Sequence, residues 1–197
     1  MRIIAGKYKA KRLNGPKTEK TRPTLDRVKE AIFSILQPYL TENSNVLDIF
    51  AGTGNLALES ISRGAKFAWI NDIENVAIST IISNTQLTNA TEYVKITKKD
   101  YIKVLNQILN ENMFFDIIFI DPPYDSMYGI KTLKYISDTK DKILSKNGLI
   151  VYETDKNFIS KIQKKDIEIL DNFENLECFD VRNYGNVVLR LYRWREL

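Results

Sequence analysis

The sequence predicts an α/β fold built on a seven-stranded, mostly parallel sheet with helices on both faces. From residue 45 onward, short apolar runs typical of buried strands alternate with stretches whose apolar residues recur at helical spacing. This alternation is typical of parallel sheets joined by right-handed crossovers. A chain of 197 residues is long enough for one compact core and short for two. We therefore expect one layered α/β unit.

The expected strands and helices follow one another closely along the chain. Strands of the parallel sheet are expected at residues 46–50, 67–70, 93–96, 115–120 and 149–152. Helices are expected between them, at residues 56–62, 76–87, 101–109 and 130–144. A late strand at 187–192, with 167–170 as its partner, brings the number of strands to seven. Ligands of such sheets bind at the carboxyl ends of the strands, so the functional residues are sought there.

The N-terminal part of the chain differs in composition from the rest. Residues 1–13 predict a β-hairpin, and an amphipathic helix begins near Thr24. Residues 1–40 carry ten Lys and Arg residues against three Asp and Glu residues, whereas the whole chain has a net charge of only +4. A nucleic-acid backbone is one partner for such a segment, and a solvated lysine-rich face is the alternative. We expect a basic unit at 1–24 and a second unit at 25–197.

Two absences restrict the chemistry. The chain has no histidine and one cysteine, Cys178, which excludes His-based nucleophilic triads, His-liganded metals and cysteine-rich zinc modules. We therefore expect no metal site. No apolar run approaches the roughly 18 residues of a membrane span, and residues 1–7 lack the apolar region of a secretion signal. Together with the lone cysteine, this predicts a cytoplasmic protein with no membrane partner.

A glycine-rich turn follows the first expected strand. It begins after Asp48 and contains Phe50, Ala51, Gly52, Thr53 and Gly54. The two glycines allow a tight turn and a close approach of the backbone to a ligand. A dinucleotide would also fit this spacing, but an acid four residues before the first glycine suits a cationic amino-acid group better than a pyrophosphate.

Acidic residues follow the next two expected strands. Asp72 lies 20 residues after Gly52, where a carboxylate accepts the hydroxyls of a ribose. Asp100, followed by Tyr101, ends the third strand, within reach of an adenine amino group. Any one of these acids could be a helix cap or a surface charge. Acids at three successive strand ends instead indicate a nucleoside cofactor site.

The fourth strand runs into Asp121, Pro122, Pro123 and Tyr124. The lone pair of an aromatic amine is delocalised, so its methylation requires acceptors that hold its two N–H groups. Asp121 supplies a carboxylate and Pro122 a carbonyl, while the two prolines fix the backbone. Tyr124 offers a ring on which a base can stack. An aspartate of ordinary pKa, about 3.9, suffices to accept the proton that methylation releases.

These segments together resemble the class I methyltransferases with a Rossmann-like fold, and more closely the bacterial small-subunit rRNA guanine-N2 methyltransferases of the RsmD type. The resemblance rests on RIIAGKYK at residues 2–9, RPTLDRVKEAIF at 22–33, LDIFAGTG at 47–54 and DPPY at 121–124. It covers nearly the whole chain, and the segment at 22–33 is the most specific to the family. Asp72 departs from the usual glutamate but retains the carboxylate.

The resemblance implies S-adenosylmethionine as cofactor and 16S rRNA as partner, within the small subunit or an assembly intermediate. It also implies that the basic N-terminal segment holds RNA. The residues expected there are Arg2, Lys7, Lys9, Lys11, Arg12, Arg22 and Arg27.

Three alternatives remain open. The motif at 121–124 suits adenine N6 as well as guanine N2, although no separate target-recognition domain is evident. An NAD-binding protein would explain the glycine turn and Asp72 but not Asp121. An RNA-binding module with a relict cofactor fold would leave Asp48, Asp100 and Asp121 without a function.

Overall fold

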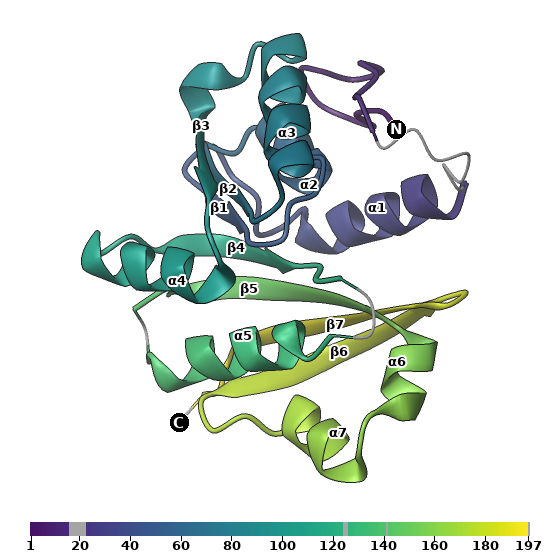
Figure 1. The fold of residues 1–197 in the computed structure, drawn as a ribbon, viewed down its shortest axis with the longest axis vertical. Coiled ribbons are helices and arrows are strands. Elements are labelled where there is room, and N and C mark those ends of the chain that lie inside the picture. The colour runs from purple at the N-terminus through teal and green to yellow at the C-terminus, as the bar shows by residue number, and fades with distance from the viewer. Residues whose placement is uncertain (16–22, 124–125, 141, 197) are drawn as a thin grey trace.

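The protein is described by a computed structural model that covers residues 1–15, 23–123, 126–140 and 142–196 (Figure 1). The strands are β1 (Asn45–Asp48), β2 (Phe67–Asp72), β3 (Val94–Lys98), β4 (Phe115–Ile120), β5 (Leu144–Asp155), β6 (Leu176–Tyr184) and β7 (Val187–Trp194). The α-helices are α1 (Pro23–Leu36), α2 (Asn55–Ser62), α3 (Asn75–Leu87), α4 (Tyr101–Asn110), α5 (Tyr128–Asp138), α6 (Lys156–Lys161) and α7 (Lys164–Asp171), with a short 3-10 turn, η1 (Thr91–Tyr93).

All seven strands form one sheet, in the order β3-β2-β1-β4-β5-β7-β6. β7 runs antiparallel to both of its neighbours, and the other pairings are parallel. The predicted seven-stranded, mostly parallel sheet is confirmed. The connections run outward in one direction from β1 and in the other from β4. The carboxyl ends of these two adjacent strands therefore flank the crevice where such folds bind ligands.

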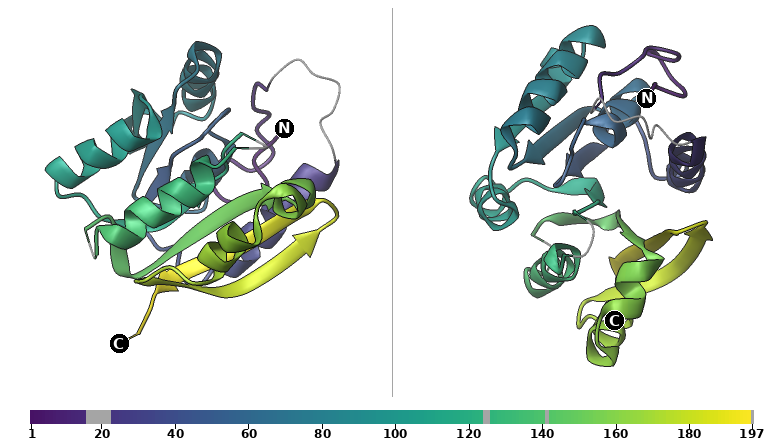
Figure 2. Two further views of the ribbon diagram at one scale, coloured as in Figure 1. Left: turned by 60° about the horizontal axis from the view of Figure 1, so that its bottom comes forward. Right: turned by 45° about the vertical axis from the view of Figure 1, so that its right-hand side comes forward.

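Successive strand residues alternate between the two faces of the sheet, so each face has its own core. On one face, Val46 and Phe119 pack with α1, α2 and α3. On the other face, Leu47 and Ile118 pack with α4, α5, α6 and α7. The long hairpin of β6 and β7 forms one end of the sheet, far from the N-terminal segment (Figures 1 and 2). None of the described helices has the length and apolar composition needed to cross a membrane.

The N-terminal hairpin is present as a reversal of the chain, but a single antiparallel bridge between Arg2 and Arg12 replaces the two expected strands. The segment packs against α2 instead of extending its own ladder. The backbone N–H groups of Lys7 and Tyr8 donate to the backbone and side-chain oxygens of Ser62, at 2.7 and 2.9 Å. These bonds curl the segment and leave it no second extended strand.

Glu59, on α2, holds the same segment in place. Its carboxylate is fully buried and accepts the N–H groups of Ile4 at 2.8 Å and Ala5 at 3.0 Å. Lys29 and Arg63 neutralise it at 3.1 and 2.8 Å. Burial of a carboxylate is tolerated only with such partners. The N-terminal segment, α1 and α2 are thus joined at one buried charge.

Two expectations near the C-terminus are wrong. Residues 167–170, expected as a strand, lie in α7, and the strand that pairs with β7 is β6. β6 is an edge strand with mostly half-buried or exposed side chains, so it lacks the apolar run that marks a buried strand. The helix expected at 130–144 ends at Asp138 as α5. Ile143 and Leu144 match its apolar spacing, but Leu144 begins β5 and pairs with Phe115.

Candidate active site

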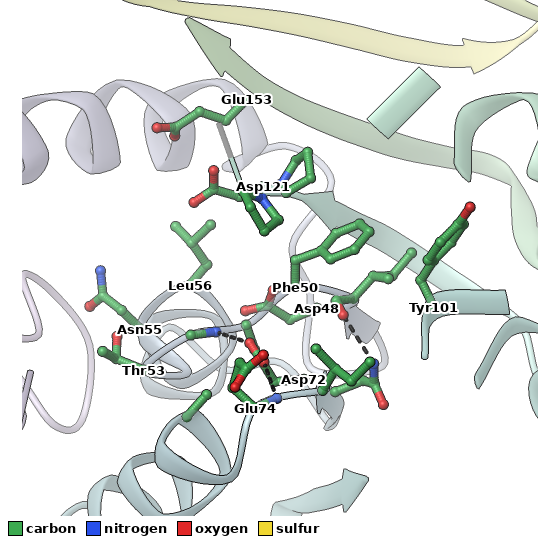
Figure 3. A pocket seen from close by; sticks show the side chains of 18 of the residues that line it. Asp48, Phe50, Thr53, Asn55, Leu56, Asp72, Glu74, Tyr101, Asp121 and Glu153 are labelled. Atoms are coloured by element: carbon green, nitrogen blue, oxygen red, sulfur yellow. Dashed lines mark hydrogen bonds between the residues drawn. The ribbon is translucent and has the colours of Figure 1, made fainter. Parts of the chain in front are cut away.

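A pocket of about 560 Å³ opens at the carboxyl ends of β1, β2 and β4, and Val28, Lys29 and Ile32 of α1 also line it (Figure 3 shows part of its lining). The sequence-predicted residues that line it are Asp48, Phe50, Ala51, Gly52, Thr53, Asp72, Asp100, Tyr101, Asp121, Pro122 and Pro123. Gly54 is not among its lining residues, and Tyr124 lies outside the described residues. The residues predicted from their positions at the ends of strands are therefore brought together around one pocket.

The glycine turn after β1 has the backbone conformation that its sequence requires. Gly52 and Gly54 have φ values of +55° and +73°, in the left-handed region that disfavours side chains. A Cβ added at Gly52 would meet no atom within 4 Å, so that position faces open space beside the pocket. Gly54 has a different structural role, since it is the N-cap residue of α2. The turn therefore presents bare backbone to a ligand.

Asp72 supports this turn from the neighbouring strand. One carboxylate oxygen accepts the N–H of Gly52 at 2.8 Å, and the other accepts the N–H of Glu74 at 2.9 Å (Figure 3). A carboxylate oxygen accepts more than one hydrogen bond, so Asp72 keeps capacity for hydroxyl donors. Its predicted contact with a ribose stays a prediction. Glu74, exposed on the same rim, is a second carboxylate that the sequence analysis missed.

Asp48, at the end of β1, is only 2% exposed. Burial and, to a smaller extent, the nearby charge of Asp121 together raise its pKa to about 8. The carboxyl lines the pocket (Figure 3). A cation in the pocket would favour the ionised form and lower this pKa. The site is therefore suited to a positively charged ligand group.

Asp100 caps the next helix, because its side chain accepts the N–H of Ile102 at 2.9 Å. The carboxyl also lines the pocket, so the capping and ligand-binding interpretations are compatible. Tyr101 follows, and its ring lies 5.7 Å from that of Phe50 and 5.4 Å from that of Tyr128. These three rings form an apolar wall suited to a planar group. Tyr128 was not predicted as a site residue.

Asp121 and Pro122 follow β4 at the other end of the pocket. The Asp121 side chain keeps some exposure to the pocket, yet burial raises its pKa to about 7. An ordinary pKa would suffice for its predicted role, and the raised pKa makes Asp121 a stronger proton acceptor than a free aspartate. Described residues contain no group of three or more His, Cys, Asp and Glu side chains arranged to hold a metal.

Glu153 and Asn71 also line the pocket and were not predicted from the sequence. Glu153, on β5, lines the pocket and is 8% exposed. An acid directly after an apolar strand run is the signal that selected Asp48, Asp72 and Asp121, and it was available here too. Asn71 is buried, and its amide donates to the carbonyls of Ile49 at 3.1 Å and Lys99 at 2.9 Å. It thereby ties the ends of three strands together.

The residues predicted to contact RNA are exposed wherever the structure describes them. They are Arg2, Lys7, Lys9, Lys11, Arg12 and Arg27, while Arg22 lies outside the described residues. Several already have local partners: Lys7 lies 3.9 Å above the ring of Tyr93, and Lys11 donates to the Leu87 carbonyl at 2.9 Å. Their contact with RNA stays a prediction.

Comparisons with known proteins assign the family. The family model described as Conserved hypothetical protein 95 matches residues 1–193. Ribosomal RNA small subunit methyltransferase D of Haemophilus influenzae is 33% identical over 194 residues, covering 98% of this chain and 93% of that protein. The chain belongs to this family. The resemblance to RsmD-type methyltransferases is confirmed.

Two further family relatives agree along the whole length of the chain. The Bacillus subtilis protein named "Putative rRNA methyltransferase YlbH" is 31% identical and covers 99% of this chain and 100% of the relative. The solved structure of the Escherichia coli protein named "Putative methyltransferase yhhF" superposes with a TM-score of 0.78 at 25% identity, covering 100% and 99% of the two chains. The predicted Rossmann-like methyltransferase fold is confirmed.

Proposed function

We propose that this protein transfers a methyl group from S-adenosylmethionine to the exocyclic N2 of a guanine in 16S ribosomal RNA. The observation that carries the proposal is the position of Asp121 and Pro122, which share one pocket with the glycine turn at Gly52. A nucleoside cofactor and an amine-binding carboxylate are thus within reach of each other. Family membership supports the same reaction and the same class of RNA.

The pocket has side chains suited to each part of S-adenosylmethionine. Asp48 faces the pocket with a pKa raised to about 8 by burial, which suits a cationic partner. Asp72 and Glu74 lie on the rim, where they can accept ribose hydroxyls, and Asp100 lies beside the aromatic wall for the adenine. When bound, this cofactor supplies an electrophilic methyl group on a positively charged sulfur. The bare backbone at Gly52 leaves room for it.

The chain's own contribution to the reaction is to hold and deprotonate the amine. Asp121 and the Pro122 carbonyl accept the two N–H groups, which exposes the nitrogen lone pair toward the methyl group. Asp121 then takes the proton that the methylated nitrogen releases, and its pKa of about 7 favours this transfer near neutral pH. Tyr124, outside the described residues, is assigned the stacking of the base.

The RNA partner is assigned to the basic N-terminal unit at residues 1–24, joined to the methyltransferase unit at 25–197. Arg2, Lys9 and Arg12 are exposed on it, and α1 carries the exposed Arg27 next in sequence to Val28 and Lys29, which line the pocket. Phosphate groups bound there would lie next to the pocket entrance. A ribosomal RNA substrate, free or within an assembling small subunit, implies the cytoplasmic location that the sequence predicts.

Methyl-labelled S-adenosylmethionine tests the proposal. Wild-type protein incubated with 16S and 23S rRNA is expected to label the 16S molecule, and Asp121→Asn to reduce labelling by at least about a hundredfold without losing affinity for S-adenosylhomocysteine. A thermal-shift control uses NADH. Stabilisation by NADH and not by S-adenosylhomocysteine would support a dinucleotide-binding protein and overturn the proposal.

A further inference from the structure

Glu153 is a pocket residue whose carboxyl group has no hydrogen-bond or ion-pair partner among the described residues. It lies near the carboxyl end of β5, lines the pocket and is 8% exposed. Among the residues that the structure describes, none donates a hydrogen bond to it and none forms an ion pair with it. Glu59, the other buried glutamate, has two backbone donors and two cations. The carboxyl group of Glu153 therefore keeps its hydrogen-bonding capacity free on the wall of the pocket, which indicates a ligand contact.

The fold places Glu153 beside Asp121. β4 and β5 run parallel with Ile120 paired to Tyr152, so Asp121 and Glu153 stand at the next step along adjacent strands, on the same face. Figure 3 shows both carboxyl groups at the same end of the pocket, pointing to the same side. Burial and the charge of Asp121 both raise the pKa of Glu153 well above its ordinary value. Both effects favour the protonated, neutral form of Glu153.

A neutral carboxyl group presents one acceptor and one donor side by side. On guanine, the positions next to the N2 amine are N1–H, a donor, and O6, an acceptor. These match the carbonyl and hydroxyl of a protonated glutamate in order. Adenine with its N6 amine at Asp121 presents N1, an acceptor, followed by a C–H group, so one of the two hydrogen bonds would be lost.

We propose that Glu153 recognises the N1–H and O6 edge of the target guanine while Asp121 holds the neighbouring N2 amine, an inference that rests on the proposed function. Glu153 thereby selects guanine over other purines that carry an amine. It acts on the choice of base and on its orientation, and the methyl transfer itself stays with Asp121 and Pro122.

The test uses 16S rRNA with either guanosine or 2-aminopurine riboside at the methylated position. 2-Aminopurine keeps the amine at C2 but lacks both N1–H and O6. Wild-type protein is expected to methylate guanosine at least about tenfold faster in single-turnover assays, since a site that pairs these groups discriminates against a base without them. Glu153→Leu should lose this preference by slowing on guanosine alone. Glu153→Gln, whose amide also offers an acceptor and a donor, should retain it.

Binding of S-adenosylhomocysteine reports whether each variant is folded. If Glu153→Leu does not fold, Glu153→Asp replaces it, since the shorter side chain should also lose the preference. An unchanged ratio of the two rates in a folded Leu or Asp variant would overturn the inference. The wild-type rate on guanosine tests the proposed function separately, because a protein that does not methylate guanosine fails before any variant is compared.

Discussion

The carboxylate of Asp72 accepts the backbone N–H of Gly52 at 2.8 Å, across 20 residues of sequence. This bond joins the end of β2 to the turn after β1, so one acid both shapes the turn and faces the pocket.

Asp72→Asn should weaken the affinity for S-adenosylhomocysteine about tenfold. An amide has one acceptor oxygen, whereas the N–H groups of Gly52 and Glu74 each bond to a separate carboxylate oxygen of Asp72. Glu92→Gln is the control, because it changes an exposed acid outside the pocket and preserves the turn. Calorimetric titration measures both, and equal losses would show that the Gly52 bond is unimportant.

Because Gly52 faces open space beside the pocket, we expect its replacement to reduce ligand affinity as well as folding stability, whereas a matched glycine elsewhere should affect stability alone. Gly52→Ala and Gly185→Ala both place a side chain at a left-handed φ, +55° and +60°, and neither Cβ would meet an atom within 4 Å. Each should lower the free energy of unfolding by about 1 kcal/mol. Only Gly52→Ala should lose cofactor affinity, because Gly185 lies in the turn between β6 and β7. Chemical denaturation and ligand titration test the pair, and normal binding by Gly52→Ala would place the cofactor elsewhere.

Asp48 predicts a pH-dependent stability. Burial raises its folded-state pKa to about 8, whereas the unfolded value is about 3.9. Between these values the unfolded chain has released a proton that the folded chain keeps, so this group destabilises the empty protein as pH rises from about 4 to about 8. Asp48→Asn should therefore be more stable than wild type by at least about 1 kcal/mol at pH 8, and similar to it at pH 4. A constant difference across this range in denaturant melts would contradict the shift.

Asp121 predicts the pH profile of the reaction. Its pKa of about 7 means that the proton acceptor is mostly protonated below neutral pH. The rate constant kcat/KM should fall about tenfold per pH unit below pH 7 and level off above it. A flat profile from pH 5.5 to 8.5 would exclude Asp121 as the acceptor.

The basic N-terminal unit predicts the salt dependence of RNA binding. Replacing Lys7 and Lys9 by Ala should reduce the slope of log affinity against log salt by about 1 to 2, as expected when two phosphate contacts are lost. Lys142 and Lys146 carry the same charge near the amino end of β5. This end of the strand lies on the side of the sheet opposite the pocket, which is at the carboxyl ends of the strands. Their double Ala variant is the control and should keep the wild-type slope in filter-binding titrations. Equal slopes for both variants would place the RNA on another surface.

The parts of this molecule that were predictable from sequence are those that local patterns determine. Asp48, Asp72 and Asp121 each end an apolar strand run, and the fold converts that shared position into one pocket. Glu153 also follows an apolar strand run, at residues 149–152. It was not predicted, because no site residue was sought at the end of that strand. The edge strand β6 has no such run.

The N-terminal segment differs from its predicted form because its backbone N–H groups bond to acceptors far away in the sequence. The alternation of residues 1–13 predicted a strand pair, but Glu59 and Ser62 take the backbone donors of that segment, more than 50 residues away in sequence. No local pattern announces this contact. Glu59→Gln should lower the free energy of unfolding by about 3 kcal/mol, because it leaves Lys29 buried without its counter-charge. Glu177→Gln, which removes an exposed pairing with Arg193, should cost less than about 1 kcal/mol.

Analysis of the methylated nucleoside tests the proposed reaction most directly. 16S rRNA from a strain lacking this gene would be incubated with the protein and methyl-labelled S-adenosylmethionine, then digested to nucleosides and resolved by mass spectrometry. Asp121 with Pro122 beside Glu153 predicts label in N2-methylguanosine at a single position. Label in N6-methyladenosine, or no label in the RNA while S-adenosylhomocysteine still binds, would contradict it.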